Sequence, residues 1–268
     1  MTNLVICGIA GRICGRIAHL SMETGELSIA GGVEAPGNPA IGRDIGEVLG
    51  TGATGHHVVD SLESVIENAD VVVAFTAPPD GTLDAARIAG NAGKPMVVGT
   101  TGMSTQQLAE FESALEDVAC VFAPSFSIGV TVLTRLVEDA ARMMGSGYDV
   151  EIVEAHHHFK TDAPSGTALA LANAAATGLG RNLDDVALYG RHGEVGARTG
   201  DEIGIHAIRA GDLAGEHTVI FGGTGEVFQL VHRAQSRDSY AVGVIQAIRY
   251  VVNSPPGMFS MRDVLGIE

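Results

Sequence analysis

The chain of 268 residues contains no tryptophan, and aromatic residues make up only 4% of it. It has three cysteines, Cys7, Cys14 and Cys120, whose spacing fits no zinc site and whose odd number cannot pair completely. These cysteines therefore favour reduced, buried thiols in a cytoplasmic protein. Apolar runs are short and broken by Gly, Asp or Pro, and the first residues resemble no export signal. We expect neither a transmembrane helix nor an association with membranes.

Positive charge is also scarce. Lys and Arg number 16 against 32 Asp and Glu, which gives a formal net charge of −16, and the only lysines are Lys94 and Lys160. A field of that sign repels nucleic acid, so nucleic acid is not an expected partner. Any anionic ligand must be held by local positive features. A GC-rich genome and adaptation to salt both explain the shortage of lysine, and composition does not separate them.

Aliphatic residues and glycine are abundant, since 46% of the chain is hydrophobic and 36 residues are Gly. This composition is typical of an α/β protein with many tight turns. Residues 3–7 form a short apolar run, Gly8 follows at once, and Ile13, Ile17 and Leu20 then recur at helical spacing. A strand, a glycine turn and a helix in this order predict a site where backbone amides meet a pyrophosphate.

The rest of the first half repeats this alternation. An apolar run ends at Val33, and Glu34 is then placed to bind the ribose hydroxyls of a dinucleotide. Further buried strands are predicted within residues 70–76, 94–101 and 118–127, with helical spacing between them. We therefore predict a Rossmann-like, doubly wound parallel sheet whose strand-end loops at 75–77, 99–101 and 123–127 line a crevice.

The pattern changes from about residue 128. A predicted helix leads to a strand over 150–156, a loop, an alanine-rich helix over 165–177, and three alternating strands within 201–234. This order predicts an α+β domain with an open mixed sheet, largely antiparallel, whose second face needs a cover such as another subunit. A final helix over 240–251 would return to the first domain. The predicted domains are 1–127 with 238–268 for dinucleotide binding, and 128–237 for substrate binding and oligomerisation.

Three consecutive histidines, His156 to His158, invite interpretation as a metal site. Neighbouring side chains on a strand point to opposite faces, so the three cannot all face one ion without a bend. Thiolate partners at zinc spacing are also missing. We therefore expect no metal, although simple decoration of a strand end remains an alternative to a functional role.

The residues that follow favour a functional role. Lys160 lies in the loop four residues after His156, and Ser165, Gly166 and Thr167 begin the next helix. We expect the amides of these three residues, with two hydroxyls, to converge on one anion, because a helix N-terminus favours negative charge. Ser165 as a plain helix cap is the simpler alternative. With the histidines, the segment predicts a site that binds a carboxylate and supplies a proton.

Residues 154–168, E-A-H-H-H-F-K-T-D-A-P-S-G-T-A, resemble the signature of the dihydrodipicolinate reductase family. Other stretches resemble that family in the same order along nearly the whole chain: V-V-G-T-T-G (97–102), F-S-I-G-V (126–130), R-A-G-D (209–212), G-E-H-T (215–218) and M-F-S-M-R-D-V-L-G (258–266). The resemblance implies reduction of a small cyclic dicarboxylate, 4-hydroxy-tetrahydrodipicolinate, by NADH or NADPH in the diaminopimelate route to lysine. It also implies a homotetramer.

The resemblance assigns roles by position. His156 and Lys160 would be the catalytic pair, with Lys160 the proton donor, and His157, Lys160, Ser165, Gly166 and Thr167 would bind the substrate. The nucleotide would contact Gly8, Ile9, Ala10, Gly11, Arg12, Ile13, Glu34, Gly99, Thr100, Thr101, Ala123, Pro124, Ser125 and Phe126.

The sequence departs from the family pattern at the nucleotide site. One additional residue precedes Gly15, and Ser125 replaces a common Asn. Members that favour NADPH often carry Arg where this chain has Ala35 and Ala77, so both candidates for binding the 2′-phosphate are missing. We expect NADH to be used at least as well as NADPH, although Arg12, Arg16 or Arg43 could reach the phosphate.

Three other classes of protein would share some of these sequence features. A dehydrogenase of sugars or amino-acid semialdehydes would share the first half but has no reason to carry K-x-D-A-P-S-G-T. A redox sensor that binds dinucleotide without catalysis would not need Lys160 or His156. A metalloprotein would use the histidine run, and metal analysis would reveal it.

Overall fold

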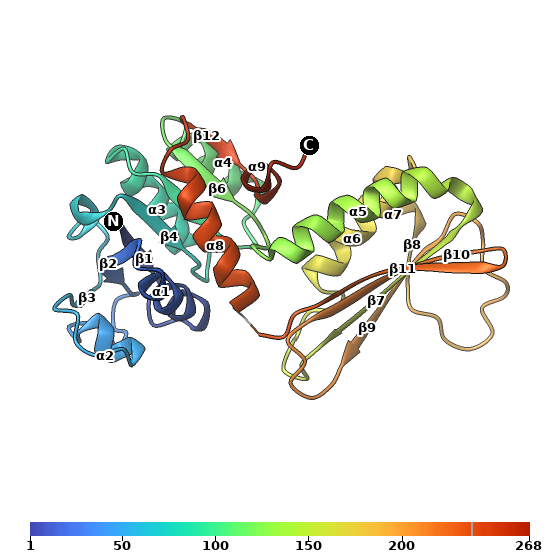
Figure 1. Cartoon of the computed structure of the whole chain (residues 1–268), viewed down its shortest axis with the longest axis horizontal. Helices are drawn as coiled ribbons and strands as arrows, with labels where there is room; N and C mark the ends of the chain where they lie inside the picture. The colour runs from blue at the N-terminus through green and yellow to red at the C-terminus, as the bar shows by residue number, and fades with distance from the viewer. Residues whose placement is uncertain (237) are drawn as a thin grey trace. The chain divides into compact units, whose positions relative to one another are not determined.

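The computed structural model describes residues 1–236 and 238–268. The chain divides into two compact units, Met1–Ile128 with Asp238–Glu268, and Gly129–Arg237 (Figure 1). Arg237, the end of the predicted second domain, lies outside the described residues. Among the described residues, no helix is both long and apolar enough to cross a membrane. The roles assigned to the two domains stay predictions.

The first unit contains a seven-stranded parallel sheet, as predicted. Its order is β12-β6-β5-β4-β1-β2-β3, and every neighbouring pair is parallel. The strands are β1 (Thr2–Cys7), β2 (Leu27–Val33), β3 (Val58–Val59), β4 (Val71–Ala74), β5 (Met96–Val98), β6 (Ala119–Phe122) and β12 (Gly257–Phe259). The edge strands β3 and β12 were not predicted, because two or three residues are too few to give a readable alternation.

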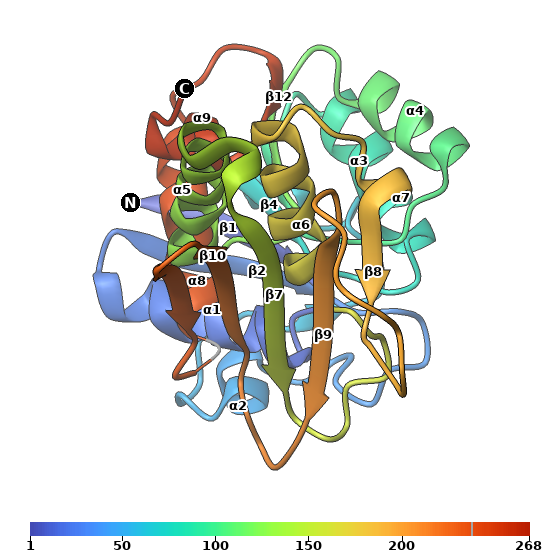
Figure 2. The ribbon, with the colours of Figure 1, turned by 90° about the vertical axis from the view of Figure 1, so that its right-hand side faces the viewer.

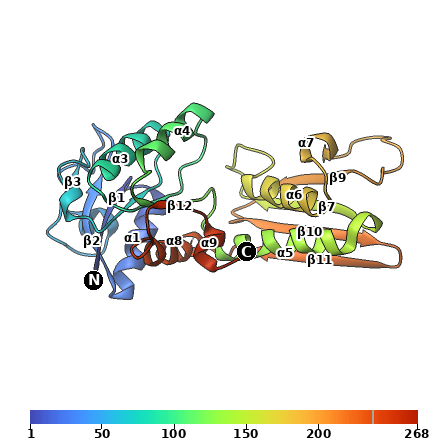
Figure 3. The same ribbon diagram turned by 90° about the horizontal axis from the view of Figure 1, so that it is seen from above.

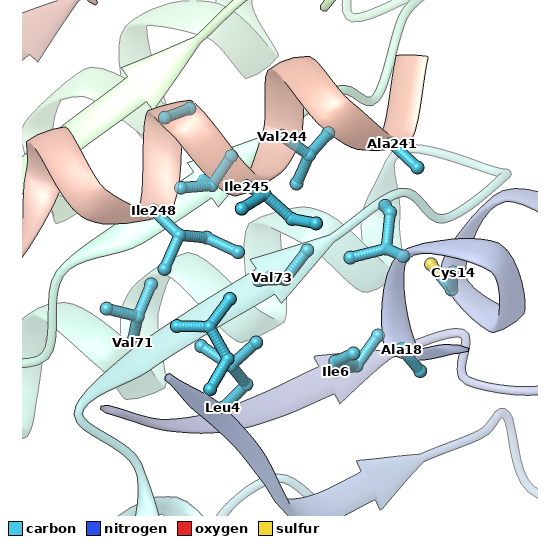
Figure 4. Close-up of a cluster of buried hydrophobic side chains, with 14 of the residues drawn as sticks. Leu4, Ile6, Cys14, Ala18, Val71, Val73, Ala241, Val244, Ile245 and Ile248 are labelled. Carbon is cyan, nitrogen blue, oxygen red and sulfur yellow. The ribbon is translucent and has the colours of Figure 1, made fainter. Parts of the chain in front are cut away.

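Helices cover both faces of this sheet. One face packs against α1 (Arg12–Thr24) and α8 (Asp238–Val251), and the other against α3 (Asp80–Asn91) and α4 (Thr105–Ala114), as Figure 3 shows. Leu4 and Ile6 of β1 point to the first face, where they belong to the same buried cluster as Val244 and Ile248 of α8 (Figure 4). The final helix thus belongs to the first unit, as expected. The short helices are α2 (Ile45–Leu49) and α9 (Met261–Leu265).

The three cysteines are divided between the two faces of this sheet. Cys7 and Cys120 lie on the α3 face and Cys14 on the α1 face, and all three are free and buried. Burial raises the pKa of Cys7 and of Cys14 to about 12, so both remain thiols near neutral pH. The expectation of reduced, buried thiols is confirmed.

The second unit contains a five-stranded mixed sheet in the order β11-β10-β7-β9-β8 (Figure 2). Its strands are β7 (Asp149–His156), β8 (Ala187–Tyr189), β9 (Ile203–Arg209), β10 (Glu216–Gly223) and β11 (Glu226–Arg233). The mixed sheet was predicted, but its description as largely antiparallel was wrong. Strand β9 runs parallel to both β7 and β8. Alternation indicates which face a residue takes and carries no information on strand direction.

Helices cover only one face of this sheet. Helices α5 (Ile128–Met144) and α6 (Gly166–Gly178) lie on the same side of the strands in Figure 1, and α7 (Leu183–Val186) follows α6. Inward residues such as Ile152, Ile205 and Phe221 form the core with them. On the other face Ile208, Val227 and Val231 are 48%, 64% and 47% exposed. The open face that the sequence predicted is therefore present.

Candidate active site

A glycine turn joins β1 to α1. Gly8 has a φ of +84°, which favours glycine, and the amide of Gly11 donates to its carbonyl over 2.8 Å. A Cβ on Gly11 would lie 2.9 Å from that oxygen, so a side chain there would open the turn. The helix begins directly afterwards at Arg12. Its first amides have no acceptor within the helix, as a phosphate-binding terminus requires.

The carboxylate of Glu34 lies beside this turn. It accepts hydrogen bonds from the amide of Ala10 over 2.7 Å and from the side-chain amide of Asn38 over 2.9 Å. Both contacts fix the carboxylate at the end of β2, where an acidic residue binds ribose hydroxyls. Asn38 was not predicted, because nothing in its sequence context separates it from an ordinary turn residue.

A pocket of about 960 Å³ opens at the carboxyl ends of β1, β2 and β4. Of the predicted nucleotide residues, its lining includes Gly8, Ala10, Gly11 and Glu34. Ile9 instead packs into the core against Gly32. Within the described chain, these predicted residues are also outside the lining: Arg12, Ile13, Gly99, Thr100, Thr101, Ala123, Pro124, Ser125 and Phe126. Their predicted role in binding is not tested by the pocket.

Acidic residues outnumber basic ones in the pocket wall. Beside Glu34 it includes Asp60, Glu63 and Asp84, with Arg87 as its cationic member among the described residues. Arg87 is engaged, because its guanidinium bonds Asp84 over 2.7 Å and Glu110 over 3.1 Å. Among the described lining residues, no basic side chain is therefore without an acidic partner.

The second unit gathers polar groups around Glu154, whose side chain is fully buried. Both terminal nitrogens of the Arg209 guanidinium donate hydrogen bonds to this carboxylate, over 2.9 and 2.8 Å. The same carboxylate lies 2.5 Å from Nδ1 of His156 and accepts from the amide of Ser165 over 3.1 Å. A single buried carboxylate therefore joins the end of β7, the end of β9 and the start of α6.

The charge of Glu154 is maintained by these partners. Burial alone would raise its pKa, but hydrogen bonds from Arg209, His156 and the Ser165 amide outweigh burial and hold the pKa below its ordinary value. A carboxylate bonded to Nδ1 leaves Nε2 of His156 as the ring atom that remains for other partners. Glu154 thereby orients the predicted catalytic histidine.

Arg209 also reaches the loop that carries Lys160. Its guanidinium donates to the carbonyl of Asp162 over 2.6 Å, and the ammonium of Lys160 lies 2.9 Å from the Asp162 carboxylate. Hydrogen bonds from the amides of His157 and His158 to the carbonyls of Leu213 and Gly211 hold the other end of the loop. The loop is thus tied at both ends.

The start of α6 differs from the predicted anion cradle in one respect. Ser165 is buried, its amide is used by Glu154, and its hydroxyl accepts from the amide of Ala168 over 3.2 Å. The expectation that the amide and hydroxyl of Ser165 face a ligand anion was wrong, because the Glu154 carboxylate takes the amide and His217 and Ala168 take the hydroxyl. The amides of Gly166 and Thr167, in the first turn of the helix, remain suited to that task.

His217 was not predicted as part of the site. It lies on β10 with 1% exposure, and its Nε2 is 3.2 Å from the Ser165 hydroxyl. Burial lowers its pKa to about 4, with the nearby His156 as a further cause. A ring that stays neutral can accept the Ser165 hydrogen. The sequence did contain a signal, since His217 and Glu154 alternate in step with apolar residues of the covered face, where a polar group needs a partner.

No group of three or more His, Cys, Asp or Glu within the described part of the chain could hold a metal ion. His156 is the last residue of β7 and His157 and His158 follow the strand. The histidine run thus divides between a buried ring on Glu154 and the loop beyond it.

Comparisons with known proteins agree with this architecture. The model of the dihydrodipicolinate reductase N-terminus matches residues 2–126, and that of the C-terminus matches residues 129–265. Proteins named 4-hydroxy-tetrahydrodipicolinate reductase from Syntrophobacter fumaroxidans and Desulfotalea psychrophila are 49% and 47% identical over the whole chain, covering 100% and 99% of those proteins. A dipicolinate-bound dihydrodipicolinate reductase from Paenisporosarcina sp. TG-14 superposes with a TM-score of 0.76 at 25% identity, covering 97% of each chain.

The parallel sheet with its glycine turn, joined to a separate unit with buried ionisable groups, defines a two-unit oxidoreductase fold. The chain belongs to the dihydrodipicolinate reductase family.

Replacing Glu154 by Gln should destabilise the second unit. The amide cannot neutralise Arg209, and loss of one partner of a buried pair costs about 3 kcal/mol in the free energy of unfolding. Denaturant titration at pH 7 would measure this cost. Since the pKa of Glu154 is lowered by folding, the advantage of the native carboxylate is present above its unfolded pKa and lost as the pH falls.

Asp201→Asn is the matched control in the same unit. Asp201 is 83% exposed and lies 3.3 Å from Arg181, so its loss should cost less than about 1 kcal/mol. Equal effects of the two variants would contradict a central role for the Glu154 carboxylate.

Proposed function

We propose that this reductase acts on 4-hydroxy-tetrahydrodipicolinate, in the diaminopimelate route to lysine, and that residues of the second unit bind the substrate and donate the proton. The activity rests on full-length relatives of 40–49% identity that bear this name. The observation that supports the residue roles is the convergence of β7, the Lys160 loop and the α6 start on the Glu154–Arg209 pair. The reduced nicotinamide nucleotide supplies the hydride, and NADH or NADPH fits a site of glycine turn, Glu34 and open pocket.

The α6 start binds a carboxylate of the substrate. A Cβ on Gly166 would meet nothing within 4 Å, so no part of the chain requires glycine there. An approaching carboxylate does require it, because a side chain would keep the ligand away from the amides of Gly166 and Thr167. Ser165 caps this helix start through its hydroxyl, which accepts from the amide of Ala168. His157, in the loop, also binds the substrate.

Lys160 donates the proton that accompanies hydride transfer. Its side chain is 21% exposed and rests on Asp162, which positions the ammonium while leaving it accessible. The substrate first loses its 4-hydroxyl group as water, which leaves a conjugated imine that accepts the hydride. Protonation of the ring nitrogen then removes the negative charge that hydride addition would leave. His156, oriented by Glu154, is the other member of the catalytic pair and sets the local charge around the reacting ring.

Lys160→Met should lower kcat by at least about a hundredfold, because the proton donor is lost. Nucleotide affinity should change little, because Lys160 lies in the second unit and the predicted nucleotide residues lie in the first. The assay couples a dihydrodipicolinate synthase to this protein and follows NADH absorbance. Lys94→Met removes the only other lysine and should leave kcat unchanged. An unaltered kcat for Lys160→Met would exclude it as the donor, and no oxidation by the native protein would overturn the function.

NADH serves at least as well as NADPH. The pocket presents Glu34, Asp60 and Glu63, and Ala35 and Ala77 lie in its lining without charge. The arginines that could reach a 2′-phosphate, Arg12, Arg16 and Arg43, lie outside the pocket lining, and Arg16 is paired with Asp238, with Nη2 at 2.9 Å from Oδ2. A phosphate bearing about two negative charges is therefore repelled by the wall and finds no free partner in it.

The ratio of kcat/KM for NADH to that for NADPH should be one or greater. Ala35→Arg should raise kcat/KM for NADPH by about tenfold, since it supplies a charge-assisted hydrogen bond. Ala53→Arg, on an exposed segment outside the pocket lining, adds the same charge and should not change the ratio. A strong preference of the native protein for NADPH would contradict this proposal.

The exposed face of the five-stranded sheet is where subunits assemble, and we take the assembly to be a homotetramer. Val227 and Val231 of β11 and Ile208 of β9 project onto this face, and no helix in the described part of the unit covers it. A sheet face with exposed apolar side chains and no cover is typical of an interface.

Val231→Asp should therefore lower the molar mass measured by light scattering from four chains toward smaller species. Met143→Asp is the control, because Met143 is 80% exposed on α5, on the covered side of the sheet, and should leave the mass unchanged. A native protein with the mass of one chain would refute the assembly.

A further inference from the structure

Thr82 joins two loops of the nucleotide site and belongs to neither. It is the third residue of α3, its side chain is fully buried, and its hydroxyl oxygen lies 2.7 Å from that of Thr76 and 2.6 Å from that of Thr100. Thr76 follows β4 and Thr100 follows β5, and the amide of Thr76 donates to the Thr100 hydroxyl over 3.1 Å. Three hydroxyls and one amide thus form a continuous chain.

The number of hydrogens limits how this chain can be arranged. Each hydroxyl has one hydrogen to donate, and two oxygen–oxygen contacts use two of the three. Thr82 can donate in only one of its contacts, so the remaining hydrogen is on Thr76 or on Thr100, unless a buried hydrogen of Thr82 is left unpaired. The middle hydroxyl therefore determines whether the end hydroxyls act as donors or acceptors.

The two ends of the chain have different surroundings. Thr76 lines the pocket of the first unit, whereas Thr100 is only 3% exposed. When Thr100 donates to Thr82 and Thr82 donates to Thr76, the free hydrogen lies at the pocket. In the reverse arrangement Thr76 donates inward and its oxygen accepts from the pocket. A hydroxyl that can do either suits a ligand with both donors and acceptors, such as a carboxamide or a sugar.

The backbone of the two loops does not depend on Thr82 alone. A Cβ on Gly99 would lie 1.9 Å from the ring of Phe75, so the loops are also in direct contact there, and Phe75 packs on Phe126 with ring centres 5.3 Å apart. Loss of the Thr82 hydroxyl should therefore leave the loops in place and affect mainly the orientation of the hydroxyls.

We propose that Thr82 is a positioning residue for the nicotinamide nucleotide, acting through Thr76 and Thr100 without touching the ligand. This inference rests on the proposed use of the first unit as the nucleotide site.

The test compares Thr82→Val with Thr82→Ser. Valine has the shape of threonine without the hydroxyl, and serine keeps the hydroxyl. We expect Thr82→Val to raise the Kd for NADH, measured by nucleotide fluorescence, and its KM by about tenfold, with kcat for bound substrate changed much less. Thr82→Ser should remain within about twofold of the native protein.

Thr134→Val is the matched control, since the Thr134 hydroxyl donates to the carbonyl of Val130 within α5 over 2.8 Å. It should change thermal stability without changing NADH affinity. A native Kd in folded Thr82→Val, even with reduced stability, would overturn the inference.

Thr76→Val tests the same chain from its pocket end. If both residues act through one chain, the double variant with Thr82→Val should bind NADH no more weakly than the weaker single variant. Additive losses would overturn the inference, as would native affinity of Thr76→Val, which also decides the question if Thr82→Val fails to fold. Failure of the native protein to bind NADH would instead refute the proposed nucleotide site.

Discussion

The buried carboxylate of Glu154 is the constraint on which the second unit depends. A charge in that position would be costly if alone, and the Arg209 guanidinium makes it tolerable through two parallel hydrogen bonds. Apart from the Ile208 carbonyl, the further partners of the pair belong to the candidate site: the His156 ring, the Ser165 amide and the Asp162 carbonyl. The stability of the second unit and the proposed catalytic geometry therefore depend on the same interaction.

Much of the fold was predictable because the strands of the first unit are buried on both faces. Residues 3–7 and 71–74 contain no charged residue, and such runs are readable without knowledge of their neighbours. Strand direction in the second unit was not predictable, since β7 and β9 pair in parallel through a connection whose course the sequence does not reveal. The short strands β3, β8 and β12 depend on neighbours for their existence and give no signal of their own.

The candidate site shows the same division between local and distant information. The motif around Lys160 could be read because its residues are contiguous, and the helix start at Ser165 is a local feature. Arg209 and His217 lie 55 and 52 residues from Glu154 and Ser165, their partners, so only the folded sheet reveals the contact. For Ser165 the sequence identified the residue but assigned its amide to the wrong acceptor, because the buried carboxylate that takes it is 11 residues away.

The acidic composition affects ligand binding at both candidate sites. With a net charge of −16, the chain offers an anionic substrate no general attraction, so in the proposed site the α6 amides and the Lys160 ammonium supply it locally. In the first unit the same acidity continues into the pocket as Glu34, Asp60 and Glu63, where it opposes a further phosphate. Scarcity of positive charge is thus useful in both places. In the second unit it leaves the proposed anion site to local groups such as Lys160, and in the first unit it supports the proposed use of NADH.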